Sequence, residues 1–185
     1  MDSHKLPKDL PIPADDGACN HLKNIQIPDI SLPNQDGNLL KLNRTDTFRL
    51  IIYCYPMTGH PSKPLPKNWD SIPGARGCTP ETCSFRDAHD DFIIRNAVPV
   101  GLSTQSVSDI KEMTARLLIA YDVVSDEYLN FVKQLQLPTF KIDDKVYIKR
   151  LTLIVEKSLI KHFFYPVFPA DLHVKEVLQW LESNG

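Results

Sequence analysis

One segment, RLIIYCYP at residues 49–56, constrains the fold more than any other part of the sequence. It is almost continuously apolar, which is typical of a β-strand that is buried on both faces of a sheet. A second run of this kind, AVPVGLST at 97–104, follows a segment with helical features at 79–96. Strands that alternate with helices in this way predict an α/β sandwich.

The remaining elements complete this pattern. Asp36-Gly37 is a hairpin turn signal between two short apolar segments, and residues 146–166 indicate two strands around a turn at 156–158. We expect further helices from Ser108, over 126–135 and over 169–183, with a short strand near 121–126. Because the last two strands resemble a hairpin, the central sheet should be mixed and flanked by helices.

The domain organisation follows from where these patterns begin. Residues 1–24 are polar and rich in proline, so we expect an N-terminal extension that lies on a single domain over 25–185. Within that domain, residues 57–76 show no periodicity. A loop of this length inside a compact domain is usually functional or mobile.

Charge and composition exclude several classes of protein. The chain has 21 Lys+Arg against 23 Asp+Glu, whereas a nucleic-acid or membrane surface needs clustered basic charge. No apolar run approaches the roughly 18–20 residues that span a bilayer, and the first residues show no apolar signal-peptide core. Four cysteines in 185 residues do not indicate a disulfide-rich scaffold. We therefore expect a soluble, cytoplasmic protein in a reducing compartment.

The segment GCTPETC at 77–83 carries the candidate chemistry. Thr79 can cap a helix and Pro80 suits its first position, so Cys78 should lie at the helix N-terminus. Unpaired backbone N–H groups and the helix dipole favour a thiolate there. Cys83 lies inside the same helix and should be a more ordinary thiol.

Helix geometry argues against a permanent disulfide between these two cysteines. Five helical residues rise about 7.5 Å and turn through about 140°, which places the Cα atoms roughly 8–9 Å apart. A disulfide tolerates about 4.4–6.8 Å, so the bond can form only if the helix start unwinds. A transient redox disulfide is favoured, while unrelated buried cysteines, a metal site and a structural disulfide remain open. The metal site is weakly supported because no second Cys/His cluster is present.

Several motifs in the chain occur together and in order. LIIYCYP, GCTPETCSFRD, VGLST, VVSDE and KRLTLIV resemble the peroxiredoxins of the bacterioferritin-comigratory (peroxiredoxin Q) type, in the AhpC/TSA-like group. The resemblance covers about residues 25–182. It implies a thioredoxin-like fold and the reduction of hydroperoxides by a cysteine thiol.

The resemblance also implies roles for individual residues. Cys78 matches the peroxidatic cysteine, Cys83 the resolving cysteine of the subtype that has one at this place, and Arg150 the arginine near the reactive sulfur. Tyr55 and Pro56 match the end of the strand that precedes the site, and we take them with Thr79 as candidate substrate-binding residues.

The chain departs from the family pattern just before Cys78. Residues 57–76 form an insertion, and Ala75 stands where the family has the threonine that orients the peroxide. Thr58 and Thr79 are the two hydroxyls that could take its place.

The implied partners are a hydroperoxide substrate and a thioredoxin-like reductant, with no metal or organic cofactor. Nucleic acid and membrane are not expected as partners, and the protein is expected to be a monomer or a weak homodimer. The alternative from another class is a thioredoxin-fold redox sensor or interaction module. It would use the Cys78–Cys83 pair as a switch, with the insertion as its contact element and with little peroxidase activity.

Overall fold

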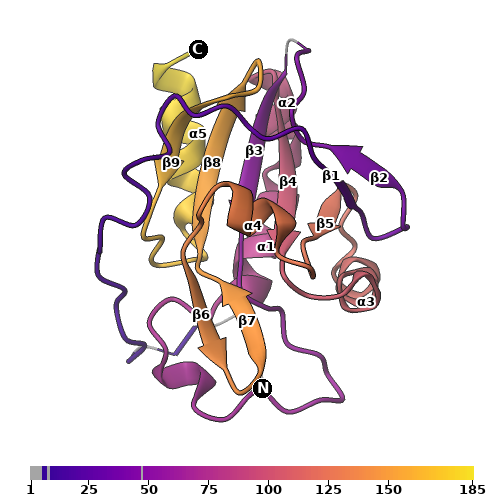
Figure 1. Ribbon diagram of the computed structural model, residues 1–185, viewed down its shortest axis with the longest axis vertical. Helices are drawn as coiled ribbons and strands as arrows, with labels where there is room; N and C mark the ends of the chain where they lie inside the picture. The colour runs from indigo at the N-terminus through magenta and orange to yellow at the C-terminus, as the bar shows by residue number, and fades with distance from the viewer. Residues whose placement is uncertain (1–5, 8, 47) are drawn as a thin grey trace.

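The computed structural model describes residues 6, 7, 9–46 and 48–185 of the chain. Its centre is a five-stranded sheet in the order β5-β4-β3-β8-β9 (Figure 1). The central strand β3 pairs in parallel with β4 and antiparallel with β8, so the predicted mixed sheet is confirmed. The five strands are β3 (Arg49–Cys54), β4 (Ala97–Ser103), β5 (Val123–Ser125), β8 (Leu151–Glu156) and β9 (Leu159–Phe164).

Strand β3 shows why the sequence of 49–56 is apolar throughout. Leu50, Ile52 and Cys54 pack into a core on one face of the sheet, while Ile51 and Tyr53 pack into a core on the other. Side chains alternate between the faces of a strand, so a strand covered on both sides is apolar at successive positions, and β3 is buried from Leu50 to Cys54.

Helices cover one face of the sheet more heavily than the other. Side chains from four helices join the core that contains Ile51 and Tyr53: α1 (Cys78–Asp87), α2 (His89–Ile94), α3 (Val107–Leu117) and α5 (His173–Ser183). On the opposite face lie α4 (Asn130–Gln134), which is in front of the sheet in Figure 1, the hairpin of β1 (Ser31–Pro33) and β2 (Leu39–Lys41), and the N-terminal extension.

Two predicted helices differ from those in the structure. The single helix expected over 79–96 is divided at Ala88 into α1 and α2. The helix expected over 126–135 begins only at Asn130, because the Asp126 carboxylate accepts hydrogen bonds from the backbone N–H groups of 130–132 and serves as the cap.

A second hairpin was not predicted. It consists of β6 (Thr139–Ile142) and β7 (Lys145–Ile148), and it supports the insertion. Trp69, in a short 3₁₀ turn η1 (Trp69–Ser71), is only 3% exposed and packs against Phe140 and Tyr147 with ring centroids 5.8 and 5.2 Å away. The segment 57–76 is therefore held against the domain by an aromatic cluster.

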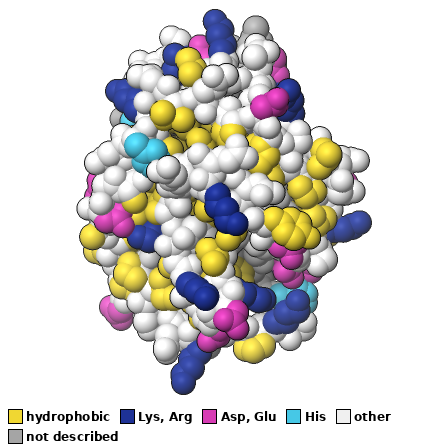
Figure 2. All heavy atoms as spheres, in the orientation of Figure 1, with side chains coloured by type: hydrophobic (Ala, Val, Ile, Leu, Met, Phe, Trp, Pro, Cys, Tyr) yellow, Lys and Arg dark blue, Asp and Glu magenta, His cyan; other side chains and the backbone are white. Residues whose placement is uncertain are grey.

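The N-terminal extension and the residues just after it are tied to the domain at two places. Asp16 accepts hydrogen bonds from Lys149 Nζ at 2.9 Å and from the Tyr165 hydroxyl at 2.8 Å, while Gln26 forms a β-bridge with Leu159 at the edge strand β9. No helix in the described part of the chain is long and apolar enough to cross a bilayer. Basic and acidic side chains are interspersed over the face seen in Figure 2, in keeping with the small net charge of -2.

Candidate active site

Cys78 is the first residue of α1. Gly77 precedes it as the cap with φ 109°, a left-handed conformation that suits glycine, and a Cβ at this position would lie 2.9 Å from the Cβ of Ala170. The prediction that Thr79 caps the helix was therefore wrong, because Gly77 turns the chain into the helix earlier. Pro80 remains in the first turn, where its missing N–H costs no hydrogen bond.

Arg150, just before β8, lies against the sulfur of Cys78. Its Nη2 donates to Cys78 Sγ at 3.1 Å. The guanidinium also donates to the backbone carbonyls of Gly74 at 3.3 Å, Ala75 at 3.4 Å and Arg76 at 3.2 Å. Only 4% of Arg150 is exposed. The structure thus brings together two of the predicted catalytic residues, which lie far apart in the sequence, and fixes the end of the insertion around them.

Glu81 completes this cluster and was missed as a site residue. Its Oε2 accepts a charge-assisted hydrogen bond from Arg150 Nη1 in a fully buried ion pair. Its other oxygen, Oε1, has no partner among the described residues. Burial raises the pKa of Glu81 to about 7, although Arg150 acts to lower it. In the sequence, Glu81 stood out only as a negative charge in the first helical turn, since its partner Arg150 lies 69 residues further along the chain.

The pKa of Cys78 differs from the sequence prediction. Burial raises the pKa of this thiol above its ordinary value, Arg150 and the backbone N–H of Met57 oppose the rise, and Glu81 adds to it. The thiol can also donate to the Ala75 carbonyl at 3.5 Å, which stabilises the neutral form. The expected low pKa was wrong because burial outweighs the groups that favour the thiolate. Burial also raises the pKa of Cys83.

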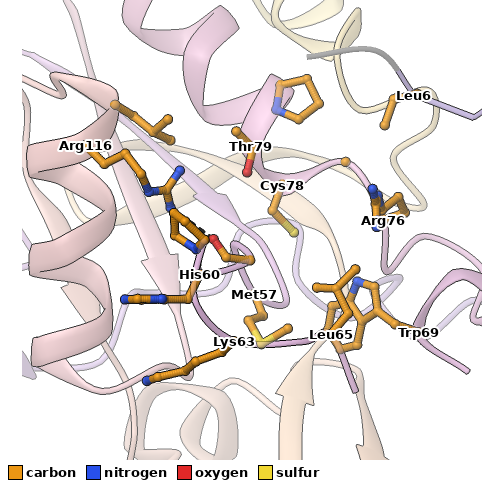
Figure 3. Close-up of a pocket in the computed structure, with 15 residues that line it drawn as sticks. Leu6, Met57, His60, Lys63, Leu65, Trp69, Arg76, Cys78, Thr79 and Arg116 are labelled. Atoms are coloured by element: carbon orange, nitrogen blue, oxygen red, sulfur yellow. Dashed lines mark hydrogen bonds between the residues drawn. The ribbon is translucent and has the colours of Figure 1, made fainter. Parts of the chain in front are cut away.

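Cys78 lies at a pocket of about 470 Å³ that the insertion helps to build (Figure 3). Apolar side chains of Met57, Leu65 and Trp69 form one part of the wall. Basic side chains form another part, and none of the described residues that line the pocket is an aspartate or glutamate. The histidine, lysine and arginines of the wall are His60, Lys63, Arg76 and Arg116.

The three predicted substrate-binding residues have different positions. Thr79 lines the pocket next to Cys78 (Figure 3). Tyr55 and Pro56 do not line it: Tyr55 is fully buried, and the Pro56 carbonyl accepts a hydrogen bond from the Ser103 hydroxyl at 3.1 Å. The hydroxyl of Thr58 does not line the pocket either, since it donates to Gln105 Oε1 at 3.3 Å.

Cys83 lies in the same unbroken helix as Cys78 and is also buried. All four cysteines are free thiols, so the structure shows no permanent disulfide between residues 78 and 83. Within residues 6, 7, 9–46 and 48–185, no group of three or more His, Cys, Asp or Glu side chains is placed to hold a metal ion.

Comparison with known proteins agrees with this geometry. The AhpC/TSA family profile matches residues 71–163, half of the chain. Among curated relatives, chloroplastic peroxiredoxin Q from Oryza sativa subsp. japonica is 24% identical over 162 residues, covering 87% of this chain and 67% of the relative. The chloroplastic peroxiredoxin Q of Populus jackii is 24% identical over 156 residues, covering 84% of this chain and 66% of the relative. The chain thus spans about two thirds of the length of these relatives.

Solved structures give the fold. Peroxidoxin BcpB from Mycobacterium tuberculosis superposes with a TM-score of 0.72 at 23% identity, covering 88% of this chain and 98% of that one. A peroxiredoxin Q from Xanthomonas campestris superposes with a TM-score of 0.67 at 22% identity, covering 95% of this chain and 96% of that one. The bacterioferritin comigratory protein of the same organism, described for its alkyl peroxide reduction activity, superposes with a TM-score of 0.67 at 21% identity, covering 95% of this chain and 98% of that one.

The fold and the family define the class of protein as a thiol peroxidase with a thioredoxin-like sandwich. The chain belongs to the AhpC/TSA family, as a peroxiredoxin of the Q type. A redox sensor with little peroxidase activity is not favoured.

The buried charges predict the effect of one substitution. Glu81→Gln keeps an oxygen that accepts from Arg150 but removes the negative charge that raises the pKa of Cys78. We expect a lower pKa for the Cys78 thiol, measured from the pH dependence of thiolate absorbance or of alkylation. Glu127→Gln, at an exposed position, is the matched control. An unchanged or higher pKa in Glu81→Gln would contradict this account of the cluster.

Proposed function

We propose that Cys78 is the peroxidatic thiol, Arg150 its activating partner and Cys83 the resolving thiol of this peroxidase. The observation that carries the proposal is the 3.1 Å contact between Arg150 and Cys78 Sγ at a pocket open to substrate. A thiolate is the nucleophile in such chemistry, and a fixed guanidinium stabilises it.

In the first step the Cys78 thiolate attacks the terminal oxygen of a hydroperoxide. The O–O bond breaks, the sulfur becomes a sulfenic acid, and the other oxygen takes a proton and leaves as water or an alcohol. Arg150 stabilises the charge that develops across the breaking bond, because its donors are already fixed by the carbonyls of 74–76.

The hydroxyl of Thr79 takes part of the role of the threonine that is absent at Ala75. Of the two hydroxyls considered from the sequence, Thr79 lines the pocket beside Cys78, whereas Thr58 is engaged with Gln105. A hydroxyl at this position can donate to the peroxide or accept its proton.

In the second step the start of α1 unwinds and Cys83 attacks the sulfenic acid. A 78–83 disulfide forms and water leaves. A thioredoxin-like dithiol then reduces the disulfide by exchange, so the cycle needs no metal or organic cofactor. We propose a reducing compartment such as the cytoplasm, because four cysteines in 185 residues do not make a disulfide-rich scaffold. The balance of charge supports neither nucleic acid nor a membrane as partner, and we propose a monomer or weak homodimer.

Substitution of the two cysteines tests this assignment. In Cys78→Ser we expect peroxidase turnover to fall to background, since no other described thiol lines the pocket. In Cys83→Ser we expect one rapid equivalent of peroxide consumption followed by loss of turnover with a thioredoxin. Cys54→Ser, in the buried core of β3, is the control and should turn over if it folds. Full turnover of Cys78→Ser would overturn the assignment.

The pocket favours organic hydroperoxides over hydrogen peroxide alone. Its volume of about 470 Å³ exceeds the roughly 30 Å³ that a water-sized molecule occupies. Met57, Leu65 and Trp69 offer apolar surface to the organic group. The related Xanthomonas campestris protein is described for alkyl peroxide reduction, which supports the same substrate class here.

A substitution in the wall separates the two substrates. Leu65→Ala should lower kcat/KM for cumene hydroperoxide about tenfold, the size expected for losing apolar contact with a substrate, and leave that for hydrogen peroxide unchanged. Leu118→Ala, at a position that is 78% exposed and outside the pocket, should change neither. Equal losses with both peroxides would remove the support for a recognition role of this wall.

A further inference from the structure

The proposed disulfide requires Cys83 to leave α1. Hydrogen bonds that hold this part of the helix in place should therefore slow disulfide formation. Thr82, directly before Cys83, has a carbonyl that accepts a hydrogen bond from outside the helix. The donor is the Tyr121 hydroxyl, at 3.1 Å. A helical carbonyl already accepts from the N–H four residues on, so Tyr121 adds a second restraint at the turn that must unwind.

This hydrogen bond is buried. Tyr121 is 5% exposed and Thr82 is fully buried. If α1 unwinds while the sheet stays in place, the hydroxyl loses this acceptor. An unsatisfied buried polar group costs more than an exposed one, so the bond opposes unwinding.

Tyr53 of β3 orients the Tyr121 hydroxyl. The two hydroxyl oxygens are 2.8 Å apart. Because Tyr121 has one proton and gives it to Thr82, Tyr53 must be the donor to Tyr121. Gly101 of β4 makes room for this arrangement, since a Cβ there would lie 2.8 Å from the Tyr53 oxygen.

The backbone of Tyr121 is also fixed. The Gln35 side chain donates to the Tyr121 carbonyl at 3.4 Å and accepts from the Val123 N–H at 2.9 Å. The Asn34 side chain donates to Asp122 at 2.8 Å. The turn of the β1–β2 hairpin thus holds the segment around Tyr121, so the hydroxyl cannot easily follow α1 when the helix moves.

We propose that Tyr121 is a positioning residue that sets the rate of disulfide formation by holding Cys83 in the helix. The inference rests on the proposed roles of Cys78 and Cys83. It means that the Cys78 sulfenic acid persists until the Tyr121–Thr82 hydrogen bond breaks. Two reactions then compete for it: Cys83 displaces water to form the disulfide, or a second hydroperoxide oxidises it to sulfinic acid and is itself reduced to water or an alcohol.

Tyr121→Phe tests this role, since it removes the donor and keeps the ring. We expect disulfide formation about three- to tenfold faster, the effect of losing one neutral hydrogen bond, with an unchanged rate of Cys78 oxidation. The two steps can be followed by stopped-flow tryptophan fluorescence, because Trp69 lines the pocket. Mass spectrometry should show less sulfinic acid than in the wild type at equal peroxide concentration.

Two further variants serve as controls. Tyr128→Phe, at a position that is 78% exposed, should change neither step. Tyr53→Phe leaves the Tyr121 donor in place but loses its orientation, so disulfide formation should accelerate by a smaller factor. If Tyr121→Phe does not fold, Tyr53→Phe still shows whether weakening the Tyr121–Thr82 hydrogen bond speeds disulfide formation.

The outcomes separate the two proposals. If the wild type forms no 78–83 disulfide with peroxide, the proposed function fails. If the wild type forms it and neither Tyr121→Phe nor Tyr53→Phe forms it faster, the role of Tyr121 alone is overturned. An equal change in both the oxidation and the resolution rates would also overturn it, because it would indicate a general disturbance of α1.

Discussion

The buried ion pair between Arg150 and Glu81 is the interaction on which the rest of the site depends. A buried charge is tolerated only when it is paired and its remaining hydrogen bonds are made. Arg150 meets this requirement with Glu81, three carbonyls at the end of the insertion and the sulfur of Cys78. One guanidinium therefore joins the start of β8, the first turns of α1 and the inserted segment, and it fixes where the reactive thiol lies.

The insertion changes what can reach that thiol. Trp69 holds the segment on the β6–β7 hairpin, and Leu65 and Met57 then face a pocket instead of open solvent. In the mechanism we propose, the same helix must hold Cys78 still for its reaction with peroxide and later release Cys83. The contact between Arg150 and the Cys78 sulfur, at the N-terminus of the helix, holds Cys78 in place. We propose that the Tyr121 contact at the second turn governs the release of Cys83, so that the two steps would be controlled by different groups around one helix.

The sequence indicated the frame of the fold but not the electrostatics of the site. Strand β3 could be predicted because an element buried on both faces leaves a local apolar pattern. Arg150 was found through resemblance to a family, since no periodicity links it to Cys78. Glu81, the β6–β7 hairpin and the raised pKa of Cys78 were missed or wrong. Each depends on burial and on partners distant in sequence, which local patterns do not record.

The most direct test of the account is peptide mass spectrometry of the reduced protein after one equivalent of hydroperoxide. The account predicts one new bond, a disulfide between Cys78 and Cys83, with Cys19 and Cys54 still as thiols. In Cys83→Ser it predicts sulfenic acid at Cys78. Oxidation that begins at another cysteine, or a protein that leaves the peroxide unreacted, would contradict it.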